Sequence, residues 1–118
     1  MSEKITVYEK PTCSTCRAMN KLLTEMGVDF EKVNYYIKPL DGDKLKELIK
    51  KLGIEAYQLV RTKEPLLQQL GVSICDATED EVIELLVKHP DLLQRPIVER
   101  GARAALGRPV ENVKTLFV

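Results

Sequence analysis

The chain has 118 residues, of which 44% are hydrophobic and 31% are charged, a composition typical of a globular domain. This length allows one domain with a buried core and is too short for two ordinary ones. The 18 basic and 18 acidic residues cancel, so the bulk charge does not support nucleic acid as a partner. No apolar run approaches the roughly 18 residues that span a bilayer, and the first residues lack an apolar signal core. We therefore expect a cytoplasmic protein with reduced thiols and no membrane partner.

The first third of the chain predicts a strand, a helix and a second strand. Alternating β-branched residues at Ile5–Tyr8 indicate the first strand. The helix after it is predicted by an apolar stripe at helical spacing, formed by Met19, Leu22, Leu23 and Met26. Gly27 would end this helix in a left-handed conformation, and Phe30–Tyr36 has the aromatic and valine content of a strand. A strand, helix and strand within about 30 residues predict a parallel βαβ unit with a right-handed connection.

The middle of the chain, approximately residues 40–92, is predicted to be a helical insert. Its first helix would begin at Asp41 or Asp43 and carry an apolar stripe formed by Leu45, Leu48, Ile49 and Leu52. A short helix is predicted at Pro65–Leu70, with proline at its first position. Thr78 and Glu81 have the spacing of a capping box that begins a further helix.

The last part of the chain predicts a β-hairpin and a final helix. The two strand candidates are Pro96–Glu99 and Ala102–Leu106, and the final helix would begin at Pro109. The complete order is β-α-β, a helical block, and then β-β-α. This order predicts an α/β protein of the thioredoxin-like fold, with residues 1–118 forming a single domain around the inserted helices.

Cys13-Ser14-Thr15-Cys16 lies directly after the first predicted strand, at the start of a helix. The free N–H groups and positive end of that helix would stabilise a thiolate at Cys13, so we expect a lowered pKa there. Cys16, one turn further on, could attack an adduct on Cys13 and release the product. Arg17 could add positive charge near the sulfur, whereas Glu9 would act the other way if its side chain points there.

Two other interpretations of the cysteine pair stay open. One is a zinc half-site, but a second close pair of ligands would be needed, and only Cys75 and His89 remain elsewhere. The other is a purely structural pair, although buried structural cysteines are not typical at the opening of a helix. We expect no metal site. We interpret Cys75 as a small buried residue or an idle thiol, and His89 as a residue that satisfies a helix C-terminus.

Several segments together resemble the arsenate reductase (ArsC-like) family, in their order and over nearly the whole chain. They are Tyr8 to Arg17 around the cysteines, Arg61 to Pro65 with Leu70-Gly71, His89 to Val98, and Leu106 to Pro109. The chain is also similar to the related Spx-like branch, which shares the fold and the paired cysteines but regulates transcription. The combination of segments carries the resemblance, since each single segment is unspecific.

The resemblance implies that Arg61, Arg95 and Arg108 surround the nucleophile Cys13 and act in catalysis together with Cys16. Guanidinium groups bind the oxygens of a tetrahedral oxyanion such as arsenate in a bidentate manner, which fits this role.

The resemblance further implies a cis peptide bond before Pro96, placed against the nucleophile. We assign Pro96 and Arg17 to the substrate-binding surface. Two residues depart from the pattern of the arsenate reductases. A histidine usually stands at the position of Glu9, and the position of Cys16 is often not a cysteine. The second departure favours an internal disulfide over a route through glutathione or glutaredoxin alone.

These features favour an enzyme that reduces arsenate to arsenite and takes its reducing equivalents from glutathione, glutaredoxin or thioredoxin, with no bound cofactor. One alternative is a glutaredoxin-like disulfide reductase without an oxyanion site. Another is a Spx-like redox sensor that docks on RNA polymerase and switches through a Cys13–Cys16 disulfide. The three arginines favour the first function, and the absence of a basic helix gives no support for direct DNA contact.

Overall fold

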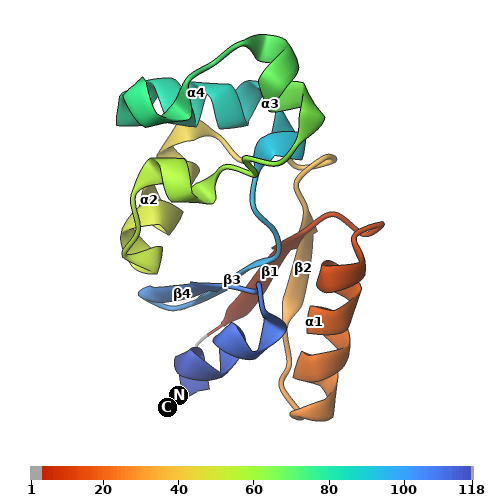
Figure 1. The fold of residues 1–118 in the computed structure, drawn as a ribbon. Helices are drawn as coiled ribbons and strands as arrows, with labels where there is room; N and C mark the ends of the chain where they lie inside the picture. Colours follow the sequence, from red (N-terminus) through yellow and green to blue (C-terminus); the bar gives the residue numbers. More distant parts are fainter. Residues whose placement is uncertain (1–3, 118) are drawn as a thin grey trace. The chain divides into compact units, whose positions relative to one another are not determined.

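The computed structural model of this chain describes residues 4–117, which form two compact units (Figure 1). Unit 1 comprises Met1–Lys38 and Arg95–Val118, and unit 2 comprises Pro39–Gln94. Within residues 4–117, no helix combines the length and the apolar character needed to cross a membrane. That the whole chain forms a single domain stays a prediction.

Unit 1 is built on a four-stranded sheet in the order β2-β1-β3-β4. The strands are β1 (Ile5–Glu9), β2 (Glu31–Asn34), β3 (Ile97–Arg100) and β4 (Arg103–Leu106). Strands β1 and β2 are parallel and connected through helix α1 (Ser14–Glu25), which confirms the predicted βαβ unit. The β3–β4 hairpin is also confirmed, and β3 pairs antiparallel with β1, with Val7 opposite Val98. The carboxyl ends of β1 and β2 therefore meet at one edge of the sheet.

The core of unit 1 lies between one face of this sheet and two helical segments, α1 and the 3₁₀ helix η4 (Val110–Phe117). Its buried members are Ile5, Val7, Met19, Leu23, Val98, Ala105, Val113 and Leu116. Ile5 and Val7 both contribute to this core because alternate side chains of a strand point to the same face of the sheet. Met26, predicted to be in the apolar stripe, is exposed because α1 has already ended there, and Gly27 turns the chain with a φ of +72°.

Several boundaries in unit 1 differ from the sequence prediction, most of them by a single residue. Strand β2 ends at Asn34, two residues before the predicted end, because the Asn34 side chain accepts a hydrogen bond from the backbone N–H of Tyr36 (3.0 Å) and turns the chain. Tyr35 and Tyr36 thus leave the strand, and their rings stack with centroids 5.0 Å apart. The final helix is present, but it is 3₁₀ throughout and begins at Val110.

Unit 2 is helical, as predicted for this part of the chain. Its helices are α2 (Gly42–Leu52), α3 (Pro65–Leu70) and α4 (Glu79–Lys88), with 3₁₀ turns η1 (Ala56–Leu59), η2 (Ile74–Asp76) and η3 (Pro90–Leu92). Asp41, not Asp43, is the N-cap of α2, and it accepts a hydrogen bond from the Lys44 backbone N–H at 2.8 Å. The capping box of α4 is confirmed, since Thr78 and Glu81 bond to each other's backbone N–H groups. The 3₁₀ turns have no periodic signal in the sequence and were not predicted.

Candidate functional site

Cys13 is the N-cap residue of α1, at the point where the chain leaves β1. Its backbone is extended (φ −79°, ψ 126°), and its N–H donates to the Lys10 carbonyl at 2.9 Å in the turn that joins the strand to the helix. The thiol is partly exposed. A nucleophile in this position can reach a substrate while its sulfur stays beside the positive end of the helix.

The surroundings of Cys13 favour its ionised form. Burial acts to raise its pKa, but the Cys16 backbone N–H, the Cys16 thiol, the Arg95 guanidinium and the Thr15 backbone N–H outweigh burial and lower the pKa to about 7. Cys13 therefore ionises at a lower pH than an ordinary cysteine does. The sulfur makes no helix-cap hydrogen bond of regular geometry.

Two arginines from the other end of unit 1 meet at Cys13. Arg108 Nη2 lies 3.7 Å from the Cys13 sulfur, and Arg108 Nε donates to the Arg95 carbonyl at 2.9 Å. The Arg95 side chain hydrogen-bonds to Cys13, and its Nη1 also lies 3.5 Å from the Tyr35 hydroxyl. Arg95 is only 8% exposed, and Tyr35 is buried as well. The two guanidinium groups thus form a positively charged surface directly beside a partly exposed thiol.

Cys16 has the opposite environment to Cys13. Its side chain is fully buried in the first turns of α1. Burial raises its pKa to about 12, and the side chain of Cys13 and the charges of Cys13 and Glu9 act in the same direction, against a hydrogen bond with the Lys10 backbone. The two cysteines therefore divide the chemistry, with Cys13 available as the thiolate and Cys16 held as the protonated partner.

Gly107 allows the segment that carries Arg108 to pass close to Pro96. The Gly107 N–H donates to the Pro96 carbonyl at 2.8 Å, and the Arg95–Pro96 peptide bond is cis, as predicted. That this bond lies against Cys13 stays a prediction. A β-carbon at Gly107 would lie 2.5 Å from Met19 Cε and 2.7 Å from Pro96 Cγ. Such distances are too short for carbon atoms, so glycine is required for this close approach.

Among the predicted site residues, no described contact ties Arg61, Arg17 or Pro96 to the cysteine sulfurs. Arg61 belongs to unit 2, where its backbone N–H donates to the Leu92 carbonyl at 2.7 Å and its Nε pairs with Glu64 Oε2 at 3.3 Å. The side chain of Arg17 is exposed, and its backbone N–H donates to the Cys13 carbonyl at 3.1 Å. The catalytic role of Arg61 and the substrate-binding roles of Arg17 and Pro96 stay predictions.

The other candidate ligands lie in unit 2. Cys75 is exposed in η2, so its interpretation as a buried residue is wrong and the interpretation as an idle thiol remains. His89 is the C-cap residue of α4, at the helix end where we placed it. Across residues 4–117, no group of three or more histidine, cysteine, aspartate or glutamate side chains could hold a metal ion.

The sequence interpretation missed two site residues, Tyr35 and Asn20. Tyr35 contacts Arg95 through its hydroxyl, and Asn20 Nδ2 donates to Glu9 Oε1 at 3.1 Å. A signal for Tyr35 was available, because it follows β2 at the edge of the sheet where Cys13 follows β1. Asn20 lies one helical turn after Cys16, on the side of α1 that faces the sheet, and only its polarity at a core-facing position could have indicated it.

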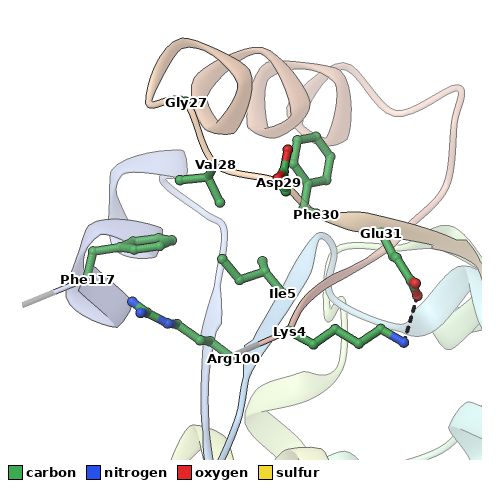
Figure 2. Close-up of a pocket in the computed structure, with 9 residues that line it drawn as sticks. All are labelled: Lys4, Ile5, Gly27, Val28, Asp29, Phe30, Glu31, Arg100 and Phe117. Carbon is green, nitrogen blue, oxygen red and sulfur yellow. Dashed lines mark ion pairs between the residues drawn. The ribbon is translucent and has the colours of Figure 1, made fainter. Parts of the chain in front are cut away.

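Figure 2 shows a pocket of about 540 Å³ in unit 1, at the amino end of β1. Lys4 and Glu31 line one side of it as an exposed ion pair, with 2.9 Å between Nζ and Oε2. On another side, the Arg100 guanidinium lies over the Phe117 ring, 4.8 Å from its centre. The described residues that line this pocket include no cysteine or histidine, and Cys13 follows the opposite end of β1. The pocket is therefore separate from the cysteine site.

The chain is similar to known proteins over almost its full length. An arsenate reductase of Neisseria meningitidis is 37% identical over 115 residues, which cover 97% of this chain and 98% of that protein. The solved arsenate reductase from Vibrio cholerae superposes with a TM-score of 0.88 at 30% identity, over 98% of both chains. The global transcriptional regulator Spx of Lactiplantibacillus plantarum is 26% identical, over 93% of this chain and 83% of that protein.

The model of the ArsC family matches residues 8–116, which include both cysteines and all three arginines that the resemblance implied. This match and the similarity to arsenate reductases confirm the thioredoxin-like α/β fold and the expected class of protein. The chain belongs to the ArsC family and is an arsenate reductase-like enzyme.

Proposed function

We propose that this protein reduces arsenate to arsenite, with Cys13 as the nucleophile and Cys16 as the residue that resolves the adduct. The observation that carries the proposal is the position of Arg95 and Arg108 around a partly exposed Cys13 sulfur. A disulfide reductase needs a reactive thiol but has no need of two guanidinium groups beside it. A tetrahedral oxyanion needs both, since planar guanidinium groups bind its oxygens through charge-assisted hydrogen bonds.

The arginines would serve the thiol and the substrate in turn. In the free protein, the guanidinium of Arg95 and Arg108 Nη2 face the Cys13 sulfur and stabilise its negative charge. When arsenate approaches, the same donors can bind its oxygens and the charge that develops on them during attack. Arg61 would be the third cation of this site, and Arg17 and Pro96 would line it, as the family resemblance implies.

The reaction balances with two thiols and one arsenate. The Cys13 thiolate attacks arsenic, a sulfur–arsenic bond forms, and one arsenate oxygen leaves as water after protonation. Cys16, as the thiolate, then attacks the Cys13 sulfur and forms a disulfide. The sulfur–arsenic bond breaks with its electron pair left on arsenic, which becomes arsenite after protonation. A cellular thiol system, glutathione, glutaredoxin or thioredoxin, would return the disulfide to two thiols.

The experiment is an NADPH-coupled assay with arsenate and each thiol system in turn. We expect consumption of NADPH that depends on arsenate with at least one of them. Cys13→Ser should abolish it, whereas the matched variant Cys75→Ser, which removes an exposed thiol of unit 2, should leave it unchanged. No arsenate turnover with any thiol system, from a protein whose disulfide still cycles rapidly, would overturn the arsenate assignment.

A redox-sensing regulator is the second candidate, because Spx is among the relatives that match nearly the whole chain. In this function the Cys13–Cys16 disulfide would change affinity for RNA polymerase and not complete a catalytic cycle. A pull-down of purified RNA polymerase by the reduced and the oxidised protein separates the two candidates. Binding that depends on the redox state, together with absent arsenate turnover, favours the regulator.

A further inference from the structure

Glu9 is a buried carboxylate at the cysteine site to which the proposed reaction gives no task. It is the last residue of β1 and is only 4% exposed. Side chains of a strand alternate between the two faces, so Glu9 shares its face with Ile5 and Val7, which pack against α1. A glutamate thus occupies the position of this apolar row that is nearest to the cysteine motif.

The contacts of Glu9 place its carboxylate beside the first turns of α1. Asn20 Nδ2 donates to Glu9 Oε1 at 3.1 Å, and Asn20 follows Cys16 by one helical turn on the same side of the helix. The Oδ1 atom of Asn20 is buried and has no partner among the described residues. The Asn20 amide group therefore donates a hydrogen bond to Glu9, while its own oxygen accepts none from the described residues. This arrangement suits an acceptor that carries negative charge.

The titratable groups that face Cys16 come from three segments. Cys13, the N-cap of α1, presents a thiolate, Glu9 at the end of β1 presents a carboxylate, and Tyr35 after β2 presents a hydroxyl. The Lys10 backbone forms a hydrogen bond with Cys16, and Arg95 interacts with Cys13 and Tyr35. Burial, Cys13 and Glu9 all raise the pKa of Cys16. Cys16 therefore has two negative neighbours, and only one of them is consumed during the reaction.

We propose that Glu9 is a positioning residue that sets the pH at which Cys16 can attack the adduct on Cys13, because its buried carboxylate lies beside that thiol. The Cys13 charge disappears when the adduct forms, and from then on the remaining charge of Glu9 decides the pH at which Cys16 can attack. This inference rests on the proposed division of roles between the two cysteines. It does not require arsenate as the substrate.

The test uses the aromatic disulfide dithiobis-nitrobenzoate, which reports the two steps separately. The Cys13 thiolate attacks one sulfur of the reagent, a protein–reagent disulfide forms, and a first coloured thiolate leaves. Cys16 then loses its proton to solvent and attacks the Cys13 sulfur. The mixed disulfide breaks, and a second coloured thiolate leaves with the electron pair. Two protein thiols are oxidised to one disulfide, and one reagent disulfide is reduced to two thiolates, so the second release measures Cys16 alone.

Glu9→Gln is the decisive variant, since it removes the charge and keeps an oxygen that can accept from Asn20. We expect the pH profile of the second release to move to lower pH by about one unit. Below the midpoint, the release accelerates by about threefold for each pKa unit, because the gain in thiolate is partly offset by its lower nucleophilicity. The first release should change by less than about twofold, because Glu9 is not among the groups that set the charge of Cys13.

Glu99→Gln is the matched control. Glu99 is also buried, at 8% exposed, and its Oε1 accepts from the Tyr8 hydroxyl at 2.7 Å on the other face of the sheet. The Glu99→Gln variant should release both coloured thiolates with the same pH profiles as the wild type. An equal shift in Glu99→Gln would show a general effect of losing a buried carboxylate and would overturn the proposal, as would a Glu9→Gln profile that coincides with the wild type.

A second variant, Glu9→His, keeps the proposal testable if thermal melting shows that Glu9→Gln does not fold. A neutral imidazole also removes the negative charge, so the second release should move to lower pH, as it does in Glu9→Gln. An unshifted profile in Glu9→His overturns the proposal. A wild type that never gives the second release overturns both the resolving role of Cys16 and this inference. A normal second release without arsenate turnover overturns only the arsenate assignment.

Discussion

The two units differ in what they bury. The buried side chains of unit 2 are all apolar, and many of them come from α2 and α4, amphipathic helices that begin at regular caps. In the described part of the chain, the buried charged residues, Glu9, Arg95 and Glu99, all belong to unit 1. Burial of a charge lowers stability unless it is paired or hydrogen-bonded. Unit 2 is therefore organised for stability, whereas unit 1 buries groups that are costly to bury, and one of them, Arg95, lies beside its reactive thiol.

The largest effect that tests this comparison is expected from Cys13→Ser. Loss of the nucleophile should lower arsenate turnover by about a thousandfold or more. The melting temperature should stay close to that of the wild type, because Cys13 makes no helix-cap hydrogen bond. The NADPH-coupled assay and a thermal melt measure the two effects. A large loss of stability in this variant would contradict the separation between chemistry and folding.

Leu48→Ala should produce the converse effect in unit 2. Leu48 is fully buried on α2, and its truncation should lower the free energy of unfolding by about 2–5 kcal/mol. Urea unfolding measures this change. In the folded variant, the pH midpoint of Cys13 alkylation should stay near 7. A shifted midpoint would contradict this division of roles between the units, since the core of unit 2 would then affect the thiol of unit 1.

Arg95→Lys tests whether a buried charge of unit 1 acts on the reactive thiol. Lysine keeps the charge but loses the planar group that contacts Cys13 and the Tyr35 hydroxyl together. We expect about tenfold slower arsenate turnover and a midpoint of Cys13 alkylation above the wild-type value. The sign follows from the lowered pKa, since a thiolate that loses a stabilising donor ionises only at higher pH. An unchanged midpoint would show that Arg95 acts on the substrate alone.

The smallest effect is expected from Thr78→Ala in the capping box of α4. The side chain of Thr78 accepts from the Glu81 N–H at 3.2 Å, and its loss should cost about 1 kcal/mol of stability. Chemical denaturation measures this cost, with Thr24→Ala on the exposed surface of α1 as a control outside the caps. Alkylation of Cys13 should be the same in both variants.

The elements of the fold could be predicted largely because local patterns specify them. The apolar stripes of α1 and α2, the Thr78–Glu81 box and the strand pattern at the start of β1 each lie within a few residues. The predictions were wrong where a side chain overrides propensity, as when Asn34 ends β2 before two aromatic residues that favour strands. The 3₁₀ turns were missed because such short segments have no periodicity.

The site was less accessible from the sequence, because its geometry depends on long-range pairing. The position of Cys13 at a helix start followed from the local motif, and the lowered pKa was expected from it. The convergence of Arg95 and Arg108 on the sulfur came only from the family resemblance. The contact between Arg95 and Tyr35 requires the register of the sheet, which a single sequence does not specify.

The site is assembled from the two ends of the chain, and this has a consequence for biosynthesis. Cys13 and Arg108 are 95 positions apart, so the ribosome completes the nucleophile long before its cations. Until the arginines have emerged and β3 has paired with β1, the thiolate lacks the Arg95 hydrogen bond that helps to lower its pKa. A nascent chain therefore presents a less ionised thiol than the folded protein does. Cys13 gains its full reactivity only when the last strands are in place.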